Sequence, residues 1–502
     1  MGHDPLDLLN SRAIFVWGRN PLVTSLHLVP ILKEARRRGA TLVLVDPVRC
    51  ESAAFCDVHV QPKVASDAHL AMAMAKVILE EDLWDRAFVA AHTHGFAEYL
   101  AFLDRYSLDE LCRTSDLPER QVREVARLYA RARPAAILFG WGLNKYRHSA
   151  EMFRFIDALA GLCGHIGVPG GGATHGYNTQ RHFDKAVEAP ERAGRQRSIP
   201  EPVLGRGMME AADPPVRMMW VNAGNPVNQS PNSNLVVRAM SALDFVVVVD
   251  TFLTDTSDYA DIFLPSTTFL EEEDVLVSWG HNIIGGVNRV IEPVGQARSD
   301  LWIFQRLAER LGFGEDMAGT SRQWLKRILA PLEARMVTVE QVLSAPVRCP
   351  VAPMVPFADK VFPSRSGKFE FITAMDYEER ALPGFPLTLV TAFSKKWLIS
   401  QILEKDHPRV ASVRVGDETA EQCGVKHGQA AVITSPVGRL QVEVVVDKAV
   451  RRGMVVMPVG TWVKRGGGAN VLTEDIMSNF GQMAAFGEAR VRLEPLAALQ
   501  TA

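Results

Sequence analysis

The chain has 502 residues, of which 47% are hydrophobic and 23% are charged, and its formal net charge is −3. This length predicts two to four domains with ordinary globular cores. The near-neutral charge gives no electrostatic basis for binding nucleic acid, and no apolar run approaches the roughly 20 residues of a membrane span. Because the first residues also lack the apolar core of a signal peptide, we expect a cytoplasmic protein with no membrane span.

The cysteines show no metal-binding pattern. All six are scattered, and no two have a C-x-x-C spacing: Cys50, Cys56, Cys112, Cys163, Cys349 and Cys423. An iron–sulfur cluster or a structural zinc normally has clustered ligands. Reduced thiols are the better interpretation, so metal chemistry would have to come from elsewhere.

The first predicted elements form a βαβ unit over residues 13–47. Apolar runs at Ala13–Trp17 and Thr41–Val45 predict two parallel strands, with a turn and a helical pattern between them. Ligands of such units bind at the carboxyl ends of the strands, where Gly18 and Asp46 lie. This stretch alone fits an α/β unit without a ligand equally well. It lacks G-x-G-x-x-G, which disfavours a plain NAD site.

The following residues complete a doubly wound domain, which we predict to span residues 1–134. Residues 57–60 predict a short edge strand, and residues 84–133 predict helices. Asp67 begins an Ala/Met/Leu-rich helix. Its carboxylate either caps that helix or faces a ligand at the edge of the sheet.

A glycine-rich segment follows a strand at 134–140 and a helix at 149–163. Four glycines lie within residues 167–172, a composition typical of a loop that presents backbone N–H groups to a phosphate or polycyclic ligand. A flexible linker is the alternative, but the neighbouring proline and apolar residues favour an ordered turn. Residues 181–207 are polar and predict a long surface excursion.

The strand–turn–helix–strand pattern then occurs a second time, between residues 216 and 250. The first copy has Gly18, Asn20, Pro21 and Asp46, and the second has Gly224, Asn225, Pro226 and Asp250. Two related ligand-binding halves are therefore predicted, since chance explains both copies poorly. We assign the second half to residues 135–375, which include the acidic run 271–273, predicted to be a solvated face, and a helical stretch at 300–345.

The composition changes again near residue 386. Short β-rich runs and a hairpin-type turn at 435–438 predict a separate β-barrel, which we assign to residues 376–502. Its last part contains another glycine-rich candidate ligand loop at 466–473. The predicted fold is thus α/β, with two Rossmann-like doubly wound domains and a double-psi-like β-barrel.

At this point the chain resembles the molybdopterin oxidoreductases of the dimethyl sulfoxide reductase and formate dehydrogenase superfamily. The matching stretches run in family order through the chain: WGRNP, VDPVRCESA, SDAHLAMA, LCGHIGVPGGG, VNAGNPVNQSPN, VVVVDTFLTDTSDYADIFLP, MVVMPVGTW and GGGANVLT. The resemblance implies a molybdenum or tungsten ion held between two molybdopterin guanine dinucleotides, one on each half. It therefore accounts for the duplication.

The resemblance also implies roles for individual residues. One guanosine diphosphate would be held by Gly18, Asn20, Asp46 and Asp67. The other would be held by Asn222, Gly224, Asn225, Asp250, Thr254 and Asp255. The pterin would lie near Gly167, Gly170 and Gly171 and would contact Asn470 of the barrel. These residue types suit a guanosine diphosphate. Backbone N–H groups at turns bind diphosphate, and Asp carboxylates accept hydrogen bonds from guanine N–H groups or ribose hydroxyls.

The sequence departs from the family at its start. Members usually begin with a [4Fe–4S] cysteine cluster and a segment that supplies the metal ligand, and the first residues here match the stretch after that ligand. Three explanations stay open: a fragment, a second polypeptide that supplies the missing part, or loss of redox chemistry. A [4Fe–4S] cluster is thus expected only from a missing segment or a partner. Formate dehydrogenases carry an arginine just past the glycine-rich loop, where this chain reads Thr174-His175-Gly176-Tyr177-Asn178. The missing arginine argues against formate as the substrate, although His175 could occupy similar space.

Two functions follow. The first is an oxidoreductase core that transfers oxygen atoms, hydride or electrons to or from a small molecule with an iron–sulfur partner, with His175, Asn178 and Arg147 near the substrate. The second is a non-catalytic relative that serves as a scaffold or electron-transfer subunit. The retained residues for pterin, such as Asn225 and Asn470, favour the first. A simple nucleotide-dependent Rossmann enzyme would leave the second half and the barrel unexplained.

Overall fold

The computed structural model describes residues 4–192, 194 and 196–496. The predicted surface excursion at 181–207 contains short 3-10 turns and the start of an α-helix at Leu204, and its residues 193 and 195 lie outside the described part. Among the described residues, no helix is long and apolar enough to cross a membrane.

The N-terminal unit is built on a five-stranded parallel sheet in the order β3-β2-β1-β5-β6. These strands are β1 (Ala13–Trp17), β2 (Thr41–Val45), β3 (Val58–Val60), β5 (Ala135–Phe139) and β6 (Gly172–Thr174). Because β5 and β6 pair in this sheet, the predicted domain boundary at residue 134 is wrong. The strand at 134–140 follows a long helical stretch and so suggests a new unit, but it pairs in register with β1. We propose that the first unit extends to about residue 174.

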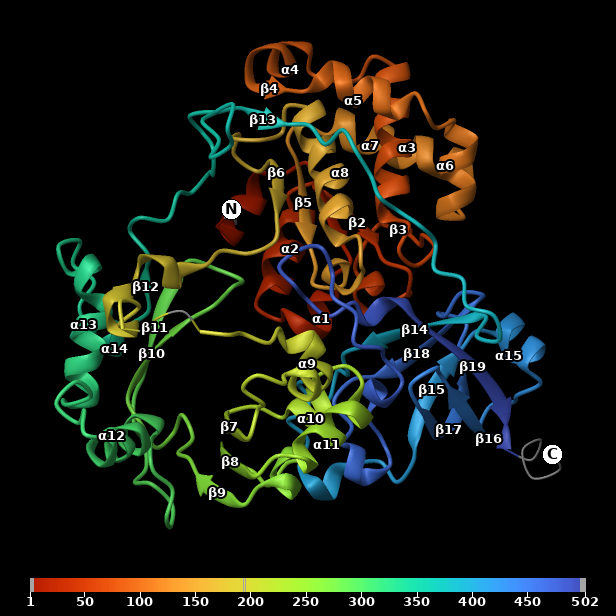
Figure 1. Cartoon of the computed structure of the whole chain (residues 1–502). Coiled ribbons are helices and arrows are strands. Elements are labelled where there is room, and N and C mark those ends of the chain that lie inside the picture. Colours follow the sequence, from red (N-terminus) through yellow and green to blue (C-terminus); the bar gives the residue numbers. More distant parts are fainter. Residues whose placement is uncertain (1–3, 193, 195, 497–502) are drawn as a thin grey trace.

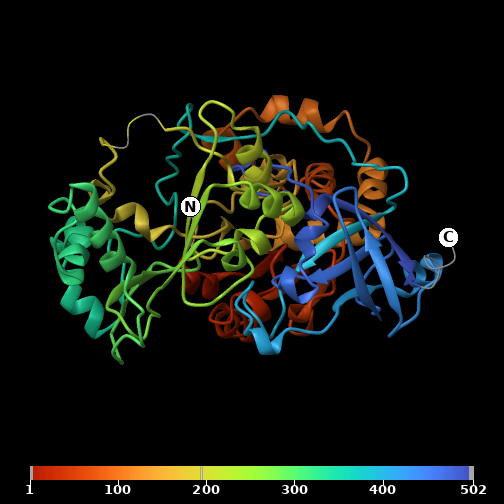
Figure 2. The ribbon, with the colours of Figure 1, turned by 60° about the horizontal axis from the view of Figure 1, so that its bottom comes forward.

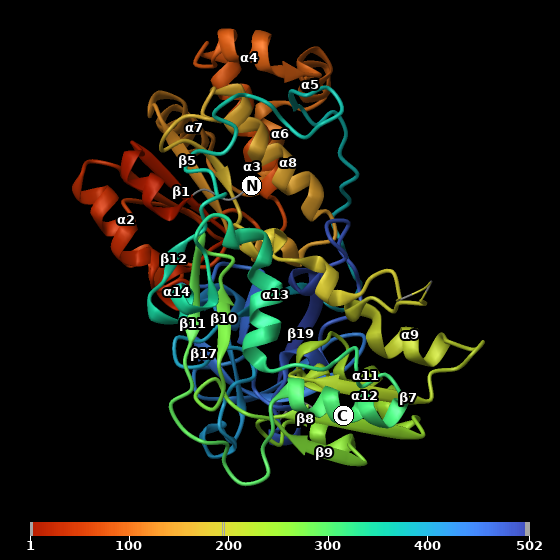
Figure 3. The ribbon, with the colours of Figure 1, turned by 90° about the vertical axis from the view of Figure 1, so that its left-hand side faces the viewer.

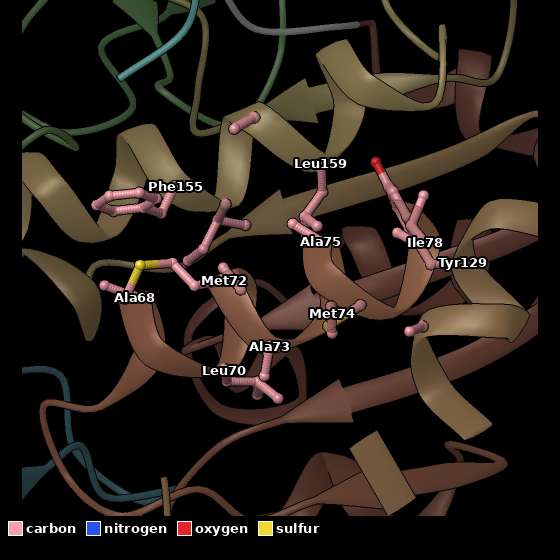
Figure 4. Packing of buried hydrophobic residues seen from close by; sticks show 14 of the residues in the cluster. Ala68, Leu70, Met72, Ala73, Met74, Ala75, Ile78, Tyr129, Phe155 and Leu159 are labelled. Atoms are coloured by element: carbon pink, nitrogen blue, oxygen red, sulfur yellow. The ribbon is translucent and has the colours of Figure 1, made fainter. Parts of the chain in front are cut away.

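Helices cover both faces of this sheet, as a doubly wound fold requires. The side chains of Ile14 and Val16 join the core under α2 (Leu28–Arg37), while Phe15 and Trp17 join the core on the other face. That second core packs α3 (Asp67–Glu80), α7 (Glu119–Arg131) and α8 (Ser149–Leu162), and Figure 4 shows its interdigitated side chains. The remaining elements of this unit are α1 (Pro21–Thr24), α4 (Arg86–His92), β4 (Thr93–His94), α5 (Phe96–Leu103) and α6 (Leu108–Ser115).

One predicted helix is divided in two. The helical pattern from residue 22 to Arg38 breaks between α1 and α2, because Pro30 has no N–H group to donate and is tolerated only in the first turn of a helix. Pro30 occupies the first turn of α2. The break keeps α1 at the carboxyl end of β1.

The second nucleotide-type unit has a three-stranded parallel sheet in the order β7-β8-β9. Its elements are α9 (Leu204–Glu210), β7 (Met218–Asn222), α10 (Pro226–Gln229), α11 (Ser233–Ser241), β8 (Phe245–Asp250) and β9 (Ile262–Pro265). The connections β7–α10–α11–β8–β9 repeat the order β1–α1–α2–β2–β3. The predicted duplication is therefore present in the topology.

A smaller antiparallel unit follows, which the sequence indicated only in its helices. It consists of β10 (Asp274–Val277), β11 (Ile283–Val287), α12 (Asp300–Leu311), α13 (Ser321–Glu333), α14 (Val339–Ser344) and β12 (Val347–Arg348). Gly285 and Gly286 interrupt the apolar alternation of β11. Gly286 is needed there, since a Cβ would lie 2.6 Å from the Val342 carbonyl oxygen of α14.

The C-terminal part forms a closed barrel of six strands in the order β14-β18-β15-β17-β16-β19. Its elements are β14 (Leu387–Ala392), β15 (Ala411–Val415), α15 (Asp417–Cys423), β16 (Ala430–Thr434), β17 (Arg439–Val446), β18 (Met454–Pro458) and β19 (Ala489–Pro495). Alternate residues of β14 and β15 point into the barrel core. The sequence missed β15 and β19 because Arg414 and Arg490 interrupt their apolar runs.

The units are arranged around one central region. Figure 1 shows the first sheet unit at the top, the second unit below it, the barrel at the lower right beside the second unit, and α12–α14 at the left. The views in Figures 2 and 3 agree with this arrangement. A long connector crosses the first unit, where β13 (Phe369–Glu370) pairs with β4. The carboxyl edges of both parallel sheets lie near the barrel: Val48, after β2, pairs with Val450, and Asp255, after β8, accepts from Val463 N–H.

Candidate cofactor site

The turn after β1 is fixed by an asparagine. Asn20 Oδ1 accepts hydrogen bonds from the Ser52 backbone N–H (3.2 Å) and the Ser52 hydroxyl (2.7 Å). The Ser52 hydroxyl oxygen in turn accepts from the backbone N–H of Leu22 at 3.0 Å. Gly18, with a φ of +62°, donates its N–H to the Val45 carbonyl at 2.8 Å. These bonds tie the start of α1 to the segment that follows β2.

The second half repeats these bonds. Asn225 Oδ1 accepts from the Thr256 backbone N–H (3.2 Å) and hydroxyl (2.7 Å), and Thr256 Oγ1 accepts from Val227 N–H at 3.2 Å. The Ala223 N–H donates to the Val249 carbonyl at 2.9 Å. We call the two sets of residues the Asn20–Ser52 cradle and the Asn225–Thr256 cradle.

The equivalence of the two cradles corrects one detail of the repeat predicted from the sequence. The residue in the left-handed conformation of the second turn is Ala223, at φ +50°, and not Gly224. Ala223 therefore takes the place of Gly18, and Gly224 takes the place of Arg19. The sequence pattern paired the two glycines, but the strand ends show that they are one residue out of register.

Buried charge gathers at the edge of the first sheet. Asp67 accepts a hydrogen bond from the Trp17 indole at 2.7 Å, and burial raises its pKa to about 6. Burial, together with Asp67, raises the pKa of Asp46 to about 7. Lys145 donates to the Thr391 carbonyl of the barrel at 2.9 Å, and burial lowers its pKa to about 8. The edge thus holds two carboxyls that are costly to ionise without a ligand.

The barrel is joined to the second half by a carboxylate. Asp255, only 2% exposed, accepts from the backbone N–H groups of Val463 (2.9 Å) and Lys464 (3.0 Å). Asn470 donates to the carbonyls of Asn228 (2.8 Å) and Gln229 (2.9 Å) at the end of α10. Both predicted cofactor residues therefore also bridge the two units.

A basic cavity opens beside this junction. Its volume is about 880 Å³, and its lining includes Lys405, His407, Arg409, Lys464 and Arg465. Lys464 also donates to the carbonyl of Thr254 at 2.9 Å. Four lining side chains are cations, and the one acidic lining residue, Glu404, pairs with Arg465. Because the cavity is thus mainly basic and adjoins the second half, it suits a diphosphate. No pattern in the sequence marks this cavity, since these residues come from two separate loops.

The second half contains polar atoms that fit an absent ligand. Asn225 Nδ2 and Thr254 Oγ1 are buried and have no hydrogen-bond partner among the described residues. Buried polar groups are almost always satisfied, so each such atom calls for a partner. Asn222 and Asp250 stand nearer the surface at the ends of β7 and β8; Asn222 donates to Asp300 at 2.9 Å and Asp250 accepts from Thr251 N–H at 2.6 Å. The residues present fit a nucleotide in this position.

The glycines of the 167–172 loop have a packing explanation. A Cβ at Gly167 would lie 2.1 Å from the Phe357 carbonyl oxygen, and one at Gly170 would lie 2.5 Å from the Asn10 carbonyl carbon. A Cβ at Gly171 would lie 2.4 Å from the His165 carbonyl oxygen. The loop is ordered against other segments, as expected of a turn and not of a linker. Its contact with the pterin stays a prediction.

The three predicted catalytic residues have different surroundings. His175 follows β6 at the edge of the sheet, where its ring stacks on Trp141 at 5.7 Å. Arg147 instead forms an ion pair with Glu488 at 2.7 Å, which ties the first unit to the barrel. Asn178 Oδ1 accepts from Gln180 N–H and caps a 3-10 turn. Within the described ranges, neither Arg147 nor Asn178 bonds to His175, and the position of all three near the substrate stays a prediction.

The sequence missed several residues of the site. Ser52 and Thr256 complete the two cradles. Trp17 donates to Asp67, Lys145 interacts electrostatically with Asp46, and Thr391 accepts from Lys145. A signal existed for the first two, because a hydroxyl residue stands six positions after each strand-ending aspartate. No comparable pattern marks Thr391, which is brought in by the docking of the barrel.

Comparison with known proteins agrees with this geometry. Residues 3–310 match the family described as Molybdopterin oxidoreductase, and residues 400–490 match the Molydopterin dinucleotide binding domain. The chain belongs to the molybdopterin oxidoreductase family. The first match includes the parallel sheets of both halves, and the second includes the barrel strands β15 to β18.

Relatives of the family match along nearly the whole chain. A probable oxidoreductase, YyaE of Bacillus subtilis, is 32% identical over 98% of this chain and 77% of its own length. Formate dehydrogenase H of Escherichia coli is 25% identical over 97% of this chain and 73% of its own length. The solved structure of acetylene hydratase from Pelobacter acetylenicus has a TM-score of 0.77 at 18% identity, covering 98% of this chain and 80% of its own. The similarity to acetylene hydratase shows that this chain has the same fold.

These findings confirm the resemblance, the fold class and the enzyme class that the sequence predicts. They also support the predicted cofactor, a molybdenum or tungsten bis(molybdopterin guanine dinucleotide). The cofactor residues predicted one by one remain predictions, to which the structure adds the two cradles.

Proposed function

We propose that this molybdopterin oxidoreductase is the cofactor-binding core of an enzyme that transfers an oxygen atom, or hydride and electrons, to or from a small molecule. The observation that carries the proposal is the pair of equivalent cradles, Asn20–Ser52 and Asn225–Thr256. Each lies at the carboxyl end of a parallel sheet, where such folds bind nucleotides. Two cradles of the same geometry suit two copies of one nucleotide.

The chain's own residues would bind and orient the cofactor. In the first half, Gly18, Asn20, Asp46 and Asp67 would hold one guanosine diphosphate; in the second, Asn222, Gly224, Asn225, Asp250, Thr254 and Asp255 would hold the other. Guanine N–H groups suit the carboxylates, since donors from a ligand would stabilise their ionised forms. Asn470 and the glycines Gly167, Gly170 and Gly171 would meet the pterin.

When bound, the metal of the cofactor supplies the redox chemistry. The protein contributes the edge of the first sheet, where Asp67 is buried and His175 is partly buried. His175 is neutral at pH 7, because burial and the nearby Arg19 lower its pKa to about 4. A neutral imidazole there would orient a substrate by hydrogen bonding and would be a weak base.

Electrons would pass through an iron–sulfur protein or segment. Several formate dehydrogenase relatives are described as alpha subunits, such as that of the F420-dependent enzyme of Methanocaldococcus jannaschii, 24% identical over 62% of this chain and 49% of its own length. A subunit name implies assembly with other chains, and we propose a comparable assembly here. The reaction itself stays unassigned between oxygen-atom and hydride transfer.

The test is metal and pterin analysis of the chain purified from an anaerobic host supplied with molybdate or tungstate. We expect one molybdenum or tungsten ion per chain and the fluorescence of oxidised pterin. Protein that is folded but contains neither metal nor pterin would contradict the proposal and would favour a scaffold. Oxidation of a reduced viologen by the loaded protein would then identify accepted substrates.

A further inference from the structure

Three residues that follow neighbouring strands lie together at the edge of the first sheet. Trp17 of β1 pairs with Phe139 of β5, and β5 pairs with β6, so Arg19, Trp141 and His175 come just beyond adjacent strand ends. The two turns are in close contact. A Cβ at Gly140 would lie 1.9 Å from the Gly18 carbonyl oxygen and 2.6 Å from the Arg19 Cα.

Arg19 has no acidic partner among the described residues. Its guanidinium donates to the Ser25 hydroxyl at 3.1 Å and, weakly, to the Phe139 carbonyl at 3.5 Å. It is half-buried, and burial alone lowers its pKa. A guanidinium has five N–H donors, so these two bonds leave three donors unused. Other half-buried arginines of the chain, such as Arg147, form ion pairs with carboxylates.

A half-buried cation without a counter-ion is unfavourable, and such groups in proteins are usually paired or bind a ligand. The planar fork of arginine matches the two oxygens of a carboxylate or phosphate. We propose that Arg19 binds an oxyanion in the space beyond β1, β5 and β6. The inference deepens the proposed function and rests on it for placing a reaction at this edge.

The neighbours of Arg19 suit such a ligand. His175 Nε2 is buried and has no partner among the described residues, so it is free to donate a second hydrogen bond in the appropriate tautomer. Trp141 and Trp279 are 50% and 54% exposed, and their rings meet at 6.5 Å. The two indoles would shield the anion from water, which strengthens its bonds to Arg19.

Two sources of an oxyanion are possible at this position: the diphosphate of the cofactor and an anionic group of the substrate. Gly224 replaces Arg19 in the second half, so only the first half has this cation. A diphosphate held by Arg19 would make cofactor retention depend on the arginine. A substrate anion would make substrate affinity, and not cofactor retention, depend on it.

The test measures the binding of inorganic phosphate and of formate, the simplest carboxylate, by calorimetry on the full chain as purified. Bound guanine nucleotide is quantified in the same samples. The variants are R19Q and R19K, and the control is R12Q, an exposed arginine at the other end of β1. R19Q should weaken anion binding at least tenfold or lose the nucleotide of one half. R19K should be intermediate, and R12Q should match the wild type.

The outcomes separate the two sources. Loss of nucleotide in R19Q assigns the anion to the cofactor, whereas weaker anion binding at unchanged nucleotide content assigns it to the substrate. Unchanged nucleotide content together with unchanged or absent anion binding overturns the proposal. A folded chain with neither metal nor pterin that still binds anions through Arg19 would contradict the proposed function and leave this inference intact.

A second readout is independent of ligand. Because Arg19 is a positive neighbour that lowers the pKa of His175, R19Q should raise that pKa from about 4 towards its ordinary value, by less than the full difference because burial remains. Nuclear magnetic resonance titration of His175 would measure it, with H175Q used to assign the signal. An unmoved His175 pKa would show that Arg19 does not face the site.

Discussion

At the scale of single residues, the site is defined by polar atoms whose environment suits a ligand better than an empty protein. Asp67 is buried at 3% exposure, and among the described residues its one side-chain partner is the Trp17 indole. Asn225 uses its oxygen twice and its buried nitrogen not at all among the described residues. Unsatisfied buried polar atoms lower the stability of the ligand-free chain, and hydrogen bonds to a bound ligand offset that cost.

Asp67 makes the ligand-free chain less stable as the pH rises. Its pKa is raised from 3.8 to about 6 in the folded state, so folding takes up a proton between these values. The free energy of unfolding therefore falls as the pH rises from about 4 to about 6, by on the order of 3 kcal/mol from this group. D67N should remove that part of the pH dependence in urea unfolding, whereas D104N, at an exposed carboxylate, should not. Parallel pH profiles for wild type and D67N would contradict the assignment.

The two cradle asparagines should have equivalent effects. N20A and N225A each leave a backbone N–H and a hydroxyl without their acceptor, which costs about 1–3 kcal/mol of unfolding free energy. Each should also lower bound guanine nucleotide towards half. N234A on α11, which loses one bond to Val437 at the surface, is the matched control. Full nucleotide content in both cradle variants would argue against the two-site account.

At the scale of elements, each site is a turn between the end of a strand and the start of a short helix. Proline follows asparagine in both turns, and both α1 and α10 begin with it. The structure also places one residue of each turn in the left-handed region, a glycine in one half and an alanine in the other. The difference between glycine and alanine allows a direct test of whether the two turns are equivalent.

G18A and A223G should change stability in opposite directions. At Gly18 a Cβ would lie 3.1 Å from Leu143 Cγ in a backbone conformation that disfavours L side chains, so G18A should cost about 1–2 kcal/mol. A223G relieves the same conformation and should stabilise by up to about 1 kcal/mol, less the added flexibility of the unfolded chain. Thermal unfolding of G18A and A223G measures the two changes in stability. Destabilisation by A223G as large as that by G18A would show that the turns differ.

The sequence predicted the elements better than their assembly. Short buried strands such as Ala13–Trp17 are bounded by turn residues and are visible as apolar runs, and the repeated Asn-Pro turn revealed the duplication. Residue 134 was a wrong boundary because pairing between β5 and β1 depends on contacts distant in sequence. Lys145 and Thr391 were missed for the same reason, since they meet only when the barrel docks. The ion pair of Arg147 with Glu488 was likewise not predicted, because its two members are distant in sequence.

At the scale of the whole molecule, two parallel sheets and a barrel are joined by the residues that would bind the cofactor. Asp255 and Asn470 connect the second half to the barrel, and Lys145 connects the first half to it. A cofactor held by all three units would stabilise their mutual arrangement by mass action. The cofactor and the architecture are therefore expected to depend on each other.

D255N tests this dependence. The amide cannot accept from both Val463 N–H and Lys464 N–H, so one backbone donor loses its partner at the junction. We expect a loss of about 1–3 kcal/mol in unfolding free energy and faster proteolysis between the second half and the barrel. D258N, at the more exposed partner of Lys464, is the control. Wild-type protease resistance in D255N would mean that the barrel docks independently of this contact.

The most direct test of the central claim is the stoichiometry of guanine nucleotide released by acid hydrolysis of the metal-loaded chain. Two cradles predict two guanosine monophosphates for each molybdenum or tungsten ion and each chain. N20A and N225A should each lower the value towards one, and the double variant should lower it towards zero. A single nucleotide per metal, or none in folded protein, would contradict the assignment of one nucleotide to each half.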